Sequence, residues 1–351
     1  MTAREYVPVI RFGALGDLIV TLPLLRRLRE HYGYQCLLIG TGWWPEPVCR
    51  GNTDVGRVIS LSRHLPSLLD PAWWSAVAAL RRCRNFPVYD ICETSRAQDA
   101  ARLLAAAGVE QGRRLTHRER AAPDDHSIER VLRAGGNELG VTSELKQSAP
   151  AVPNFVVFEH ERKTCAIWLQ RRGIWGKPLV LIQTGNRRTM GSMRRRHRRL
   201  NRDDKAWPIE NWRQLLRAAH DRLPEAAFLL CGAPPEEKFL HEIQAATALD
   251  CVMPAVLDLR SLFALFEIAH SMISIDTGPA HAAAALNVPL VVMFGSQSRD
   301  RWLPRSAGSP VVGVGGPPEM SRVDEIPVAA VFERWCQLTE VAQLRCDKSQ
   351  E

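Results

Sequence analysis

The sequence predicts an α/β protein made of two similar domains, each with a mainly parallel β-sheet covered by helices on both faces. Short β-branched and apolar runs alternate with segments of helical periodicity, which is the pattern of strand–helix–strand units. The pattern weakens between residues 111 and 153 and starts again near residue 175. A length of 351 residues also fits two domains better than one. We therefore expect a joint near residues 173–177.

Strands and helices alternate along the expected first domain, residues 1–173. The expected strands are 7–12, 36–40, 58–61 and 89–93, and the expected helices are 19–30, 71–84, 97–107 and 155–172. Asp70 and Pro71 favour a helix start at that point, because aspartate caps a helix N-terminus and proline fits its first position.

The expected second domain, residues 174–327, repeats this alternation. Its expected strands are 178–183, 226–230, 272–275 and 289–294, and its expected helices are 209–223, 235–246, 262–270 and 280–286. Residues 328–344 are amphipathic, so we expect residues 328–351 to form a C-terminal helix and tail.

The charge is the one compositional feature that indicates a partner. The chain carries 46 Lys and Arg against 38 Asp and Glu, a formal net charge of +8. Such an excess fits nucleic acid, a membrane surface or a phosphorylated substrate, and composition does not choose among them. No apolar run approaches the ~20 residues of a membrane-spanning helix, and the start lacks the apolar segment of a signal peptide. We expect a cytoplasmic protein whose nine scattered cysteines are reduced.

The first candidate site is the loop Gly13-Ala14-Leu15-Gly16-Asp17, which joins the first expected strand to a helix. In open α/β sheets, ligands bind beyond the carboxyl ends of the strands. Small residues let the backbone come close to a ligand, and a helix N-terminus offers N–H groups to an anion. The alternative is a tight turn in which Asp17 only caps the helix. The glycine spacing is not GxGxxG, which argues against a dinucleotide site.

The second candidate site follows the strand at 272–275, in the run Asp276-Thr277-Gly278-Pro279-Ala280-His281. The Thr277 hydroxyl and the N–H groups of Gly278 and Ala280 fit a diphosphate, helped by the helix dipole. Asp276 and His281 fit sugar or ribose hydroxyls. The alternative is an N-capped, alanine-rich helix that only packs.

The third candidate site is a basic stretch that runs from Arg194 to Arg199 and on to Lys205. Lys205 precedes Trp207-Pro208 and a helix start, a place where a cation can meet a phosphate. The alternative for the arginine block is a solvated loop. The block has no interleaved aromatic residues, which weakens a nucleic-acid function. No zinc-hydrolase, GxSxG, Walker A or kinase motif is present in the sequence.

These stretches together resemble glycosyltransferase family 9, the bacterial ADP-heptose-using heptosyltransferases of lipopolysaccharide core assembly. The similar segments are IRFGALGDLIVTLPLLRRLRE at residues 10–30, RDDKAWPIENW at 202–212 and DTGPAH at 276–281, the family's most specific motif. Phe294-Gly295-Ser296-Gln297 and Trp302-Leu303-Pro304 then follow in the family's order.

The resemblance implies a GT-B architecture of two facing Rossmann-like domains, with the acceptor on the first and ADP-heptose on the second. It also implies an inverting transfer that needs no metal or other cofactor. Asp17 would be the general base for the acceptor hydroxyl, and Lys205 would offset the charge of the departing diphosphate. Asp276 and His281 would contact the donor, and Glu236 its ribose. The other expected binding residues are Gly13, Ala14, Leu15, Gly16, Thr184, Thr277, Gly278 and Pro279.

The partners that follow from the resemblance are an ADP-sugar and an anionic, lipid-linked acceptor that ends in Kdo or heptose. Peripheral contact with the cytoplasmic face of the inner membrane is expected, and nucleic acid is not. Several positions depart from the family pattern: Val20 replaces a histidine, Glu93-Thr94-Ser95 replaces Asp-Gln-Gly, a common proline is missing near Ser298-Arg299, and the arginine block is unusual. The same donor chemistry on a protein or another glycan stays open, as does a basic nucleic-acid-binding protein.

Overall fold

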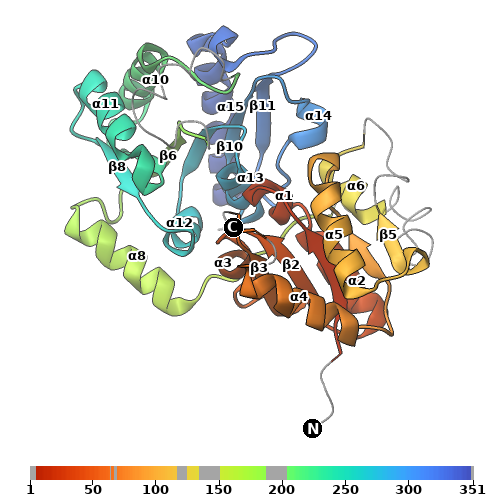
Figure 1. Cartoon of the computed structure of the whole chain (residues 1–351). Helices are drawn as coiled ribbons and strands as arrows, with labels where there is room; N and C mark the ends of the chain where they lie inside the picture. Colours follow the sequence, from red (N-terminus) through yellow and green to blue (C-terminus); the bar gives the residue numbers. More distant parts are fainter. Residues whose placement is uncertain are drawn as a thin grey trace. The chain divides into compact units, whose positions relative to one another are not determined.

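The computed structural model describes residues 5–63, 65–66, 69–116, 125–133, 151–186 and 204–348. The chain forms two compact units, Met1–Val156 and Val157–Glu351, and each holds one parallel sheet with helices packed on it (Figure 1). The predicted fold class, α/β with two parallel-sheet domains, is confirmed. Among the described helices, none has the length and apolar character needed to cross a membrane.

The first unit holds a five-stranded parallel sheet in the order β3-β2-β1-β4-β5. Its strands are β1 (Val7–Arg11), β2 (Cys36–Thr41), β3 (Val55–Leu61), β4 (Val88–Asp90) and β5 (Arg114–Thr116). Its helices are α1 (Leu15–Ile19), α2 (Leu22–Tyr32), α3 (Pro45–Cys49), α4 (Pro71–Arg82), α5 (Ala97–Ala107) and α6 (Ser127–Leu132). The strand order reverses between β1 and β4, which makes this the topological switch point of the sheet.

Local sequence explains how the elements of this unit begin and pack. The predicted start of α4 is confirmed, because the Asp70 side chain accepts a hydrogen bond of 3.0 Å from the Ala72 N–H. Trp73, Val77 and Leu80 lie one helical turn apart on the same face of α4 and are buried in the core against the sheet. The expected helix at 19–30 is instead two helices, α1 and α2, separated at Val20 and Thr21.

The second unit holds a six-stranded parallel sheet in the order β11-β10-β9-β6-β7-β8. Its strands are β6 (Leu179–Gln183), β7 (Ala227–Gly232), β8 (Val252–Val256), β9 (Ser271–Ile275), β10 (Leu290–Phe294) and β11 (Val311–Gly315). Its helices are α8 (Glu159–Arg171), α10 (Ile209–Arg222), α11 (Glu237–Thr247), α12 (Leu259–Phe266), α13 (Gly278–Ala285), α14 (Arg299–Trp302) and α15 (Val328–Lys348). Numbered from β6, the strand order is 3-2-1-4-5-6, so the switch point lies between β6 and β9.

The C-terminal helix α15 packs on the second unit, against β10, β11 and α10. Trp335 of α15 is fully buried, and its indole N–H donates a hydrogen bond of 2.9 Å to the Ser271 hydroxyl at the start of β9. Buried tryptophan side chains contribute a large apolar area together with one polar contact. We therefore place residues 328–348 with the second sheet rather than as a separate part.

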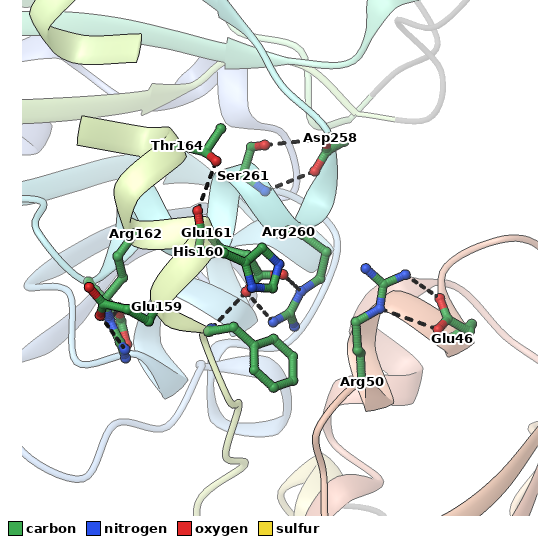
Figure 2. Close-up of polar contacts among 12 residues, drawn as sticks. Glu46, Arg50, Glu159, His160, Glu161, Arg162, Thr164, Asp258, Arg260 and Ser261 are labelled. Carbon is green, nitrogen blue, oxygen red and sulfur yellow. Dashed lines mark hydrogen bonds and ion pairs between the residues drawn. The ribbon is translucent and has the colours of Figure 1, made fainter. Parts of the chain in front are cut away.

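The boundary between the two units falls at residue 156, whereas the sequence placed the joint at residue 173. The helix α8 accounts for the difference, because it packs on α12 of the second unit. Its Glu161 carboxylate receives two hydrogen bonds from the buried Arg260 of α12, at 2.7 and 2.5 Å, and one of 2.9 Å from the Phe158 N–H (Figure 2). Helical periodicity reveals a helix but not the partner on which it packs, so the sequence could not assign α8 to a domain.

Electrostatics at this contact favour the ionised carboxylate. Burial acts to raise the pKa of Glu161, but the hydrogen bonds from Arg260 and the Phe158 N–H, with the positive charge of Arg260, outweigh it and hold that pKa below its usual value. The exposed Arg162, one residue along α8, adds a two-pronged ion pair with Glu267, at 2.7 and 2.9 Å. The start of α8 is therefore fixed to the second unit by two arginine–carboxylate pairs.

Candidate functional site

The loop at residues 13–17 lies at the switch point of the first sheet. It follows β1 directly, and beside it the chain leaves β4, where the Ile91 N–H donates a hydrogen bond of 2.9 Å to the Ile10 carbonyl. Ligands of open α/β sheets bind at this place because the flanking connections run to opposite faces and leave a crevice. The sequence-predicted loop thus has the position expected of a binding site.

Asp17 is the third residue of α1, and both of its carboxylate oxygens are engaged. Oδ1 pairs with Nη2 of Arg11 at 2.9 Å, and Oδ2 accepts a hydrogen bond of 2.7 Å from the Ala14 N–H at the helix start. The Asp17 carbonyl accepts from Nε of Arg11 at 3.0 Å and from the Thr21 hydroxyl at 2.9 Å. Asp17 therefore does cap its helix, as the alternative proposed, yet 22% of its side chain stays exposed.

The small residues of the loop have a structural reason. A Cβ atom on Gly13 would lie 2.7 Å from Cβ and Oδ2 of Asp17, so any larger residue would displace the carboxylate. Ala14 is the N-cap residue of α1, and Leu15 and Gly16 form its first turn, with Gly16 buried. The loop and the carboxylate are consequently one packed unit.

At the switch point of the second sheet, Thr184 and Asp276 follow neighbouring strands. Gln183 of β6 pairs with Ser274 of β9, so the residues just beyond these two strands lie side by side. Asp276 is also tied to β10, because its N–H donates a hydrogen bond of 2.9 Å to the Met293 carbonyl. Thr184 is buried, and its hydroxyl has no hydrogen-bond partner among the described residues. A buried hydroxyl without a partner costs free energy, which a bound ligand could recover.

Lys205 and Asp276 form a close ion pair. Nζ of Lys205 lies 2.6 Å from Oδ2 of Asp276 and donates a second hydrogen bond of 3.0 Å to the carbonyl of the same residue. The structure therefore brings together two residues that are 71 positions apart in the sequence and that were predicted separately. Lys205 keeps 25% of its side chain exposed, whereas Asp276 is buried.

The segment that carries Lys205 is held from both sides. The buried Trp207 donates its indole N–H to the Ile326 carbonyl at 3.1 Å and packs edge-on against Trp212. Asp204 accepts hydrogen bonds from the N–H and the hydroxyl of Ser296, and its carbonyl accepts from the Val323 N–H at 2.8 Å.

Gly295 lies beside this segment and makes room for it. A Cβ atom at Gly295 would lie 2.2 Å from the Asp204 carbonyl oxygen, so only glycine fits there. The Phe294-Gly295-Ser296-Gln297 segment thus supports the backbone next to Lys205.

The N-terminus of α13 differs in two respects from the prediction. Thr277 is the N-cap residue, but its hydroxyl donates to the Ile275 carbonyl at 3.3 Å and does not cap the helix. The expectation that the Ala280 N–H serves a ligand is contradicted, because it donates to the Thr277 carbonyl at 3.2 Å. Pro279 has no N–H, so Gly278 supplies the first-turn N–H group of this helix.

Two other predicted residues are buried with protein partners. His281 lies inside α13, and its ring packs edge-on against Trp302, with the centroids 6.3 Å apart. Glu236 follows β7 in a short 3₁₀ turn (Pro234–Glu236), where its Oε2 accepts a hydrogen bond of 3.0 Å from the Ala233 N–H. His281 is thus packed within its helix and Glu236 is hydrogen-bonded within its turn, and their contact with a donor stays a prediction.

The remaining predictions concern arginines and metals. The Arg194–Arg199 block lies outside the described residues. Within the described ranges, no cluster of three or more His, Cys, Asp or Glu side chains has the arrangement of a metal site.

Eight described cysteines are free thiols, and burial raises the pKa of Cys231, beside the second switch point, to about 12.

Two residues of these sites were missed from the sequence, Arg11 and Asp204. Arg11 stands in the otherwise apolar strand VPVIR, and a charged residue in a buried parallel strand needs a partner, so it was a usable signal. Asp204 offered no such signal, because its partner Ser296 lies 92 residues away.

Comparison with known proteins finds a family likeness in the second unit. Residues 197–327, which include Lys205, Glu236 and the loop between β9 and α13, match the model of glycosyltransferase family 9 (heptosyltransferase). Over these residues the chain resembles glycosyltransferase family 9. The chain is also 23% identical over 311 residues to lipopolysaccharide heptosyltransferase 3 of Escherichia coli, covering 83% of this chain and 84% of that relative.

Two further likenesses concern a shorter region and the fold. Over 99 residues the chain is 33% identical to lipopolysaccharide heptosyltransferase 1 of Escherichia coli K12, a stretch that spans 27% of this chain and 29% of that relative. The structure of Escherichia coli ADP-heptose lipopolysaccharide heptosyltransferase II matches 96% of this chain and 100% of its own, with a TM-score of 0.70 at 18% identity. That likeness establishes the shared two-sheet fold.

Proposed function

We propose that this protein is an inverting heptosyltransferase of glycosyltransferase family 9 that moves heptose from ADP-heptose to a phosphorylated sugar of the lipopolysaccharide core. The observation that carries the proposal is the chemistry at the two switch points. One offers a held, partly exposed carboxylate, and the other offers a held, partly exposed ammonium group beside a helix N-terminus. Glycosyl transfer from a nucleotide sugar needs one group of each kind, a base for the acceptor and a cation for the diphosphate.

On the acceptor side, Asp17 is proposed as the general base. The acceptor hydroxyl oxygen attacks the anomeric carbon of the heptose while its proton passes to the Asp17 carboxylate. The bond from that carbon to the phosphate oxygen breaks, and ADP leaves with the electron pair. Because one displacement occurs, the configuration at the anomeric carbon inverts, and no covalent enzyme intermediate forms. The loop from Gly13 to Gly16 would line the acceptor site.

On the donor side, Lys205 and the start of α13 are proposed to stabilise the departing diphosphate. Negative charge builds on the leaving oxygen, and an ammonium group held in advance lowers the energy of that state without reorganisation. The Gly278 N–H and the helix dipole would add to this effect. Thr184 and the hydroxyl of Thr277 would bind phosphate oxygens, while Asp276, His281 and Glu236 would contact the sugar and the ribose.

The donor is tested by incubating the protein with ADP-, UDP- and GDP-sugars and following thermal stability. The proposal expects stabilisation by ADP-heptose and ADP, because a ligand that binds only the folded state raises its stability. A protein that responds to UDP- or GDP-sugars alone would contradict the proposed donor class.

The acceptor is tested by mass analysis of products formed from ADP-heptose with a panel of acceptors. The proposal expects one heptose added to a phosphorylated, lipid-linked acceptor that ends in Kdo or heptose, together with release of ADP. Transfer to a protein or to an unrelated glycan instead would retain the donor chemistry and replace the acceptor. We propose that the reaction takes place at the cytoplasmic face of the inner membrane, where such an acceptor would be anchored.

A further inference from the structure

Arg11 is a buried charge in the middle of the first sheet. It ends β1, the central strand, in which every residue is buried. Removing a guanidinium from water is costly unless hydrogen-bond acceptors surround it. Arg11 must therefore be held by specific partners, and their identity indicates what the charge does.

All three acceptors that the structure gives Arg11 lie around the switch point. Nη2 pairs with Oδ1 of Asp17 at 2.9 Å, Nε donates to the Asp17 carbonyl at 3.0 Å, and Nη1 donates to the Ile91 carbonyl. Arg11 thus joins the side chain and the backbone of Asp17 in α1 to the chain that leaves β4. The planar guanidinium has its donors in a fixed fork, so these contacts restrict the direction of the carboxylate.

The remaining contacts of Asp17 make this restriction complete. Oδ2 accepts the Ala14 N–H at 2.7 Å, so one donor lies on each oxygen, and the carboxylate occupies the space that a Cβ at Gly13 would fill. Each carboxylate oxygen has two lone pairs, so one per oxygen is left beyond these two contacts. Since 22% of the side chain is exposed, a hydroxyl could reach the carboxylate and donate its proton to that remaining capacity.

We propose that Arg11 is a positioning residue that holds the Asp17 carboxylate in one orientation for proton transfer from the acceptor. The inference rests on the proposed function, because it requires Asp17 to be the base. Arg11 is buried and does not itself touch the substrate; it acts through Asp17. A small misplacement of a catalytic group is enough to slow a reaction strongly, so the loss of Arg11 should reduce the rate while donor binding continues.

The experiment measures kcat, the KM for ADP-heptose and Tm for the variants Arg11→Met and Arg11→Lys. We expect kcat to fall on the order of 10²-fold in Arg11→Met, with the KM of the donor unchanged. Arg11→Lys keeps the charge but loses the fork, so its kcat should lie between those of Arg11→Met and the wild type. The lysine variant also keeps the test decisive if Arg11→Met does not fold.

A double-mutant cycle with Asp17→Asn separates positioning from a structural role. If Arg11 acts through Asp17, then adding Arg11→Met to Asp17→Asn lowers the residual rate no further. Additive losses in the double variant would overturn the proposal. So would an unchanged kcat per folded molecule in Arg11→Met and Arg11→Lys.

Arg113→Met serves as a matched control. Arg113 is a half-buried arginine of the same unit whose guanidinium donates to the Cys83 and Phe86 carbonyls at 2.7 and 2.8 Å. Its loss should lower Tm and leave kcat unchanged, and a fall in kcat equal to that of Arg11→Met would overturn the positioning role.

If Asp17→Asn itself retains full activity, the base assignment fails and Arg11 loses its role with it. If Asp17→Asn is inactive while Arg11→Met is not, only the inference about Arg11 fails.

Discussion

The ion pairs at the two switch points are built in opposite senses. In the first unit the cation is buried and the anion is partly exposed, with 1% of the Arg11 side chain and 22% of the Asp17 side chain accessible. In the second unit the anion is buried and the cation is partly exposed, with 9% for Asp276 and 25% for Lys205. In each pair the accessible member carries the charge that its proposed partner needs. The same sheet topology can therefore present a base or a cation, depending on which member of the pair the core covers.

The largest effect is expected from Asp17→Asn, which removes the exposed anion of the first pair. Asparagine keeps the shape of the side chain and an oxygen for the Ala14 N–H, so the loop should persist while the base is lost. We expect kcat to fall by about 10²–10⁴-fold, the usual contribution of a general base. The Kd for ADP, measured by calorimetry, should stay the same. Wild-type turnover in this variant would show that the exposed carboxylate of the first pair is not the general base.

The next largest effect is expected from Lys205→Met, which removes the exposed cation of the second pair. We expect kcat to fall by about 10²–10³-fold, because one stabilising donor at a developing charge is lost. Unlike Asp17→Asn, this variant should also bind ADP more weakly, which calorimetry can measure. An unaltered Kd for ADP would show that Lys205 does not face the diphosphate. Lys238→Met, on α11 and without a role in either site, is the matched control.

A third ion pair, Glu161 with Arg260, tests the rule that only an exposed member takes part in the reaction. Both of its side chains are buried, at 7% and 8% exposure. Glu161→Gln should lower the free energy of unfolding by about 3 kcal/mol, because it removes the charged partner of the buried Arg260. Denaturant unfolding measures this loss, and kcat per folded molecule should not change. A variant that is stable yet slow would contradict the rule.

The same pair predicts an acid dependence of stability. The folded state holds the pKa of Glu161 below its usual value, so the carboxylate contributes stability above the unfolded pKa of about 4.5. That contribution is lost as the pH falls through the folded pKa. The two Tm values should therefore stay equally far apart from pH 7 down to about pH 4.5, and Tm of the wild type should approach Tm of Glu161→Gln as the pH falls further. Parallel curves for the two proteins would contradict the coupling.

The smallest effects are expected at the two glycines beside the ion pairs. A Cβ at Gly295 meets the backbone oxygen of Asp204, which cannot move aside, so Gly295→Ala should cost about 1–3 kcal/mol of stability. The three atoms nearest to a Cβ at Gly13 all belong to the Asp17 side chain, so Gly13→Ala should lower kcat more than Tm. Gly112→Ala, at a position where a Cβ meets nothing within 4 Å, is the control. Equal losses of Tm at Gly13 and Gly295 would contradict this distinction.

The central strands were predictable from the sequence, and most edge strands were not. The apolar runs of β1, β2, β6, β9 and β10 are buried on both faces and were all found. The strands β5, β8 and β11 lie at sheet edges and were missed. Pro254 interrupts β8, Gly313 interrupts β11, and β5 has three residues, so none shows a continuous apolar run. An edge strand packs against fewer neighbours, and its sequence is correspondingly less constrained.

The sequence by itself determined the α/β class, the two loops that follow β1 and β9, and the polar residues on them. Those features are local, because strand periodicity, glycine-containing turns and helix starts are encoded within a few neighbouring residues. Only the tertiary structure decided which charges pair, which member of each pair is covered and which unit holds α8. Arg11 with Asp17, Lys205 with Asp276 and Glu161 with Arg260 are 6, 71 and 99 residues apart. Whether a charged side chain is buried depends on the packing of the whole sheet, which a local sequence pattern does not specify.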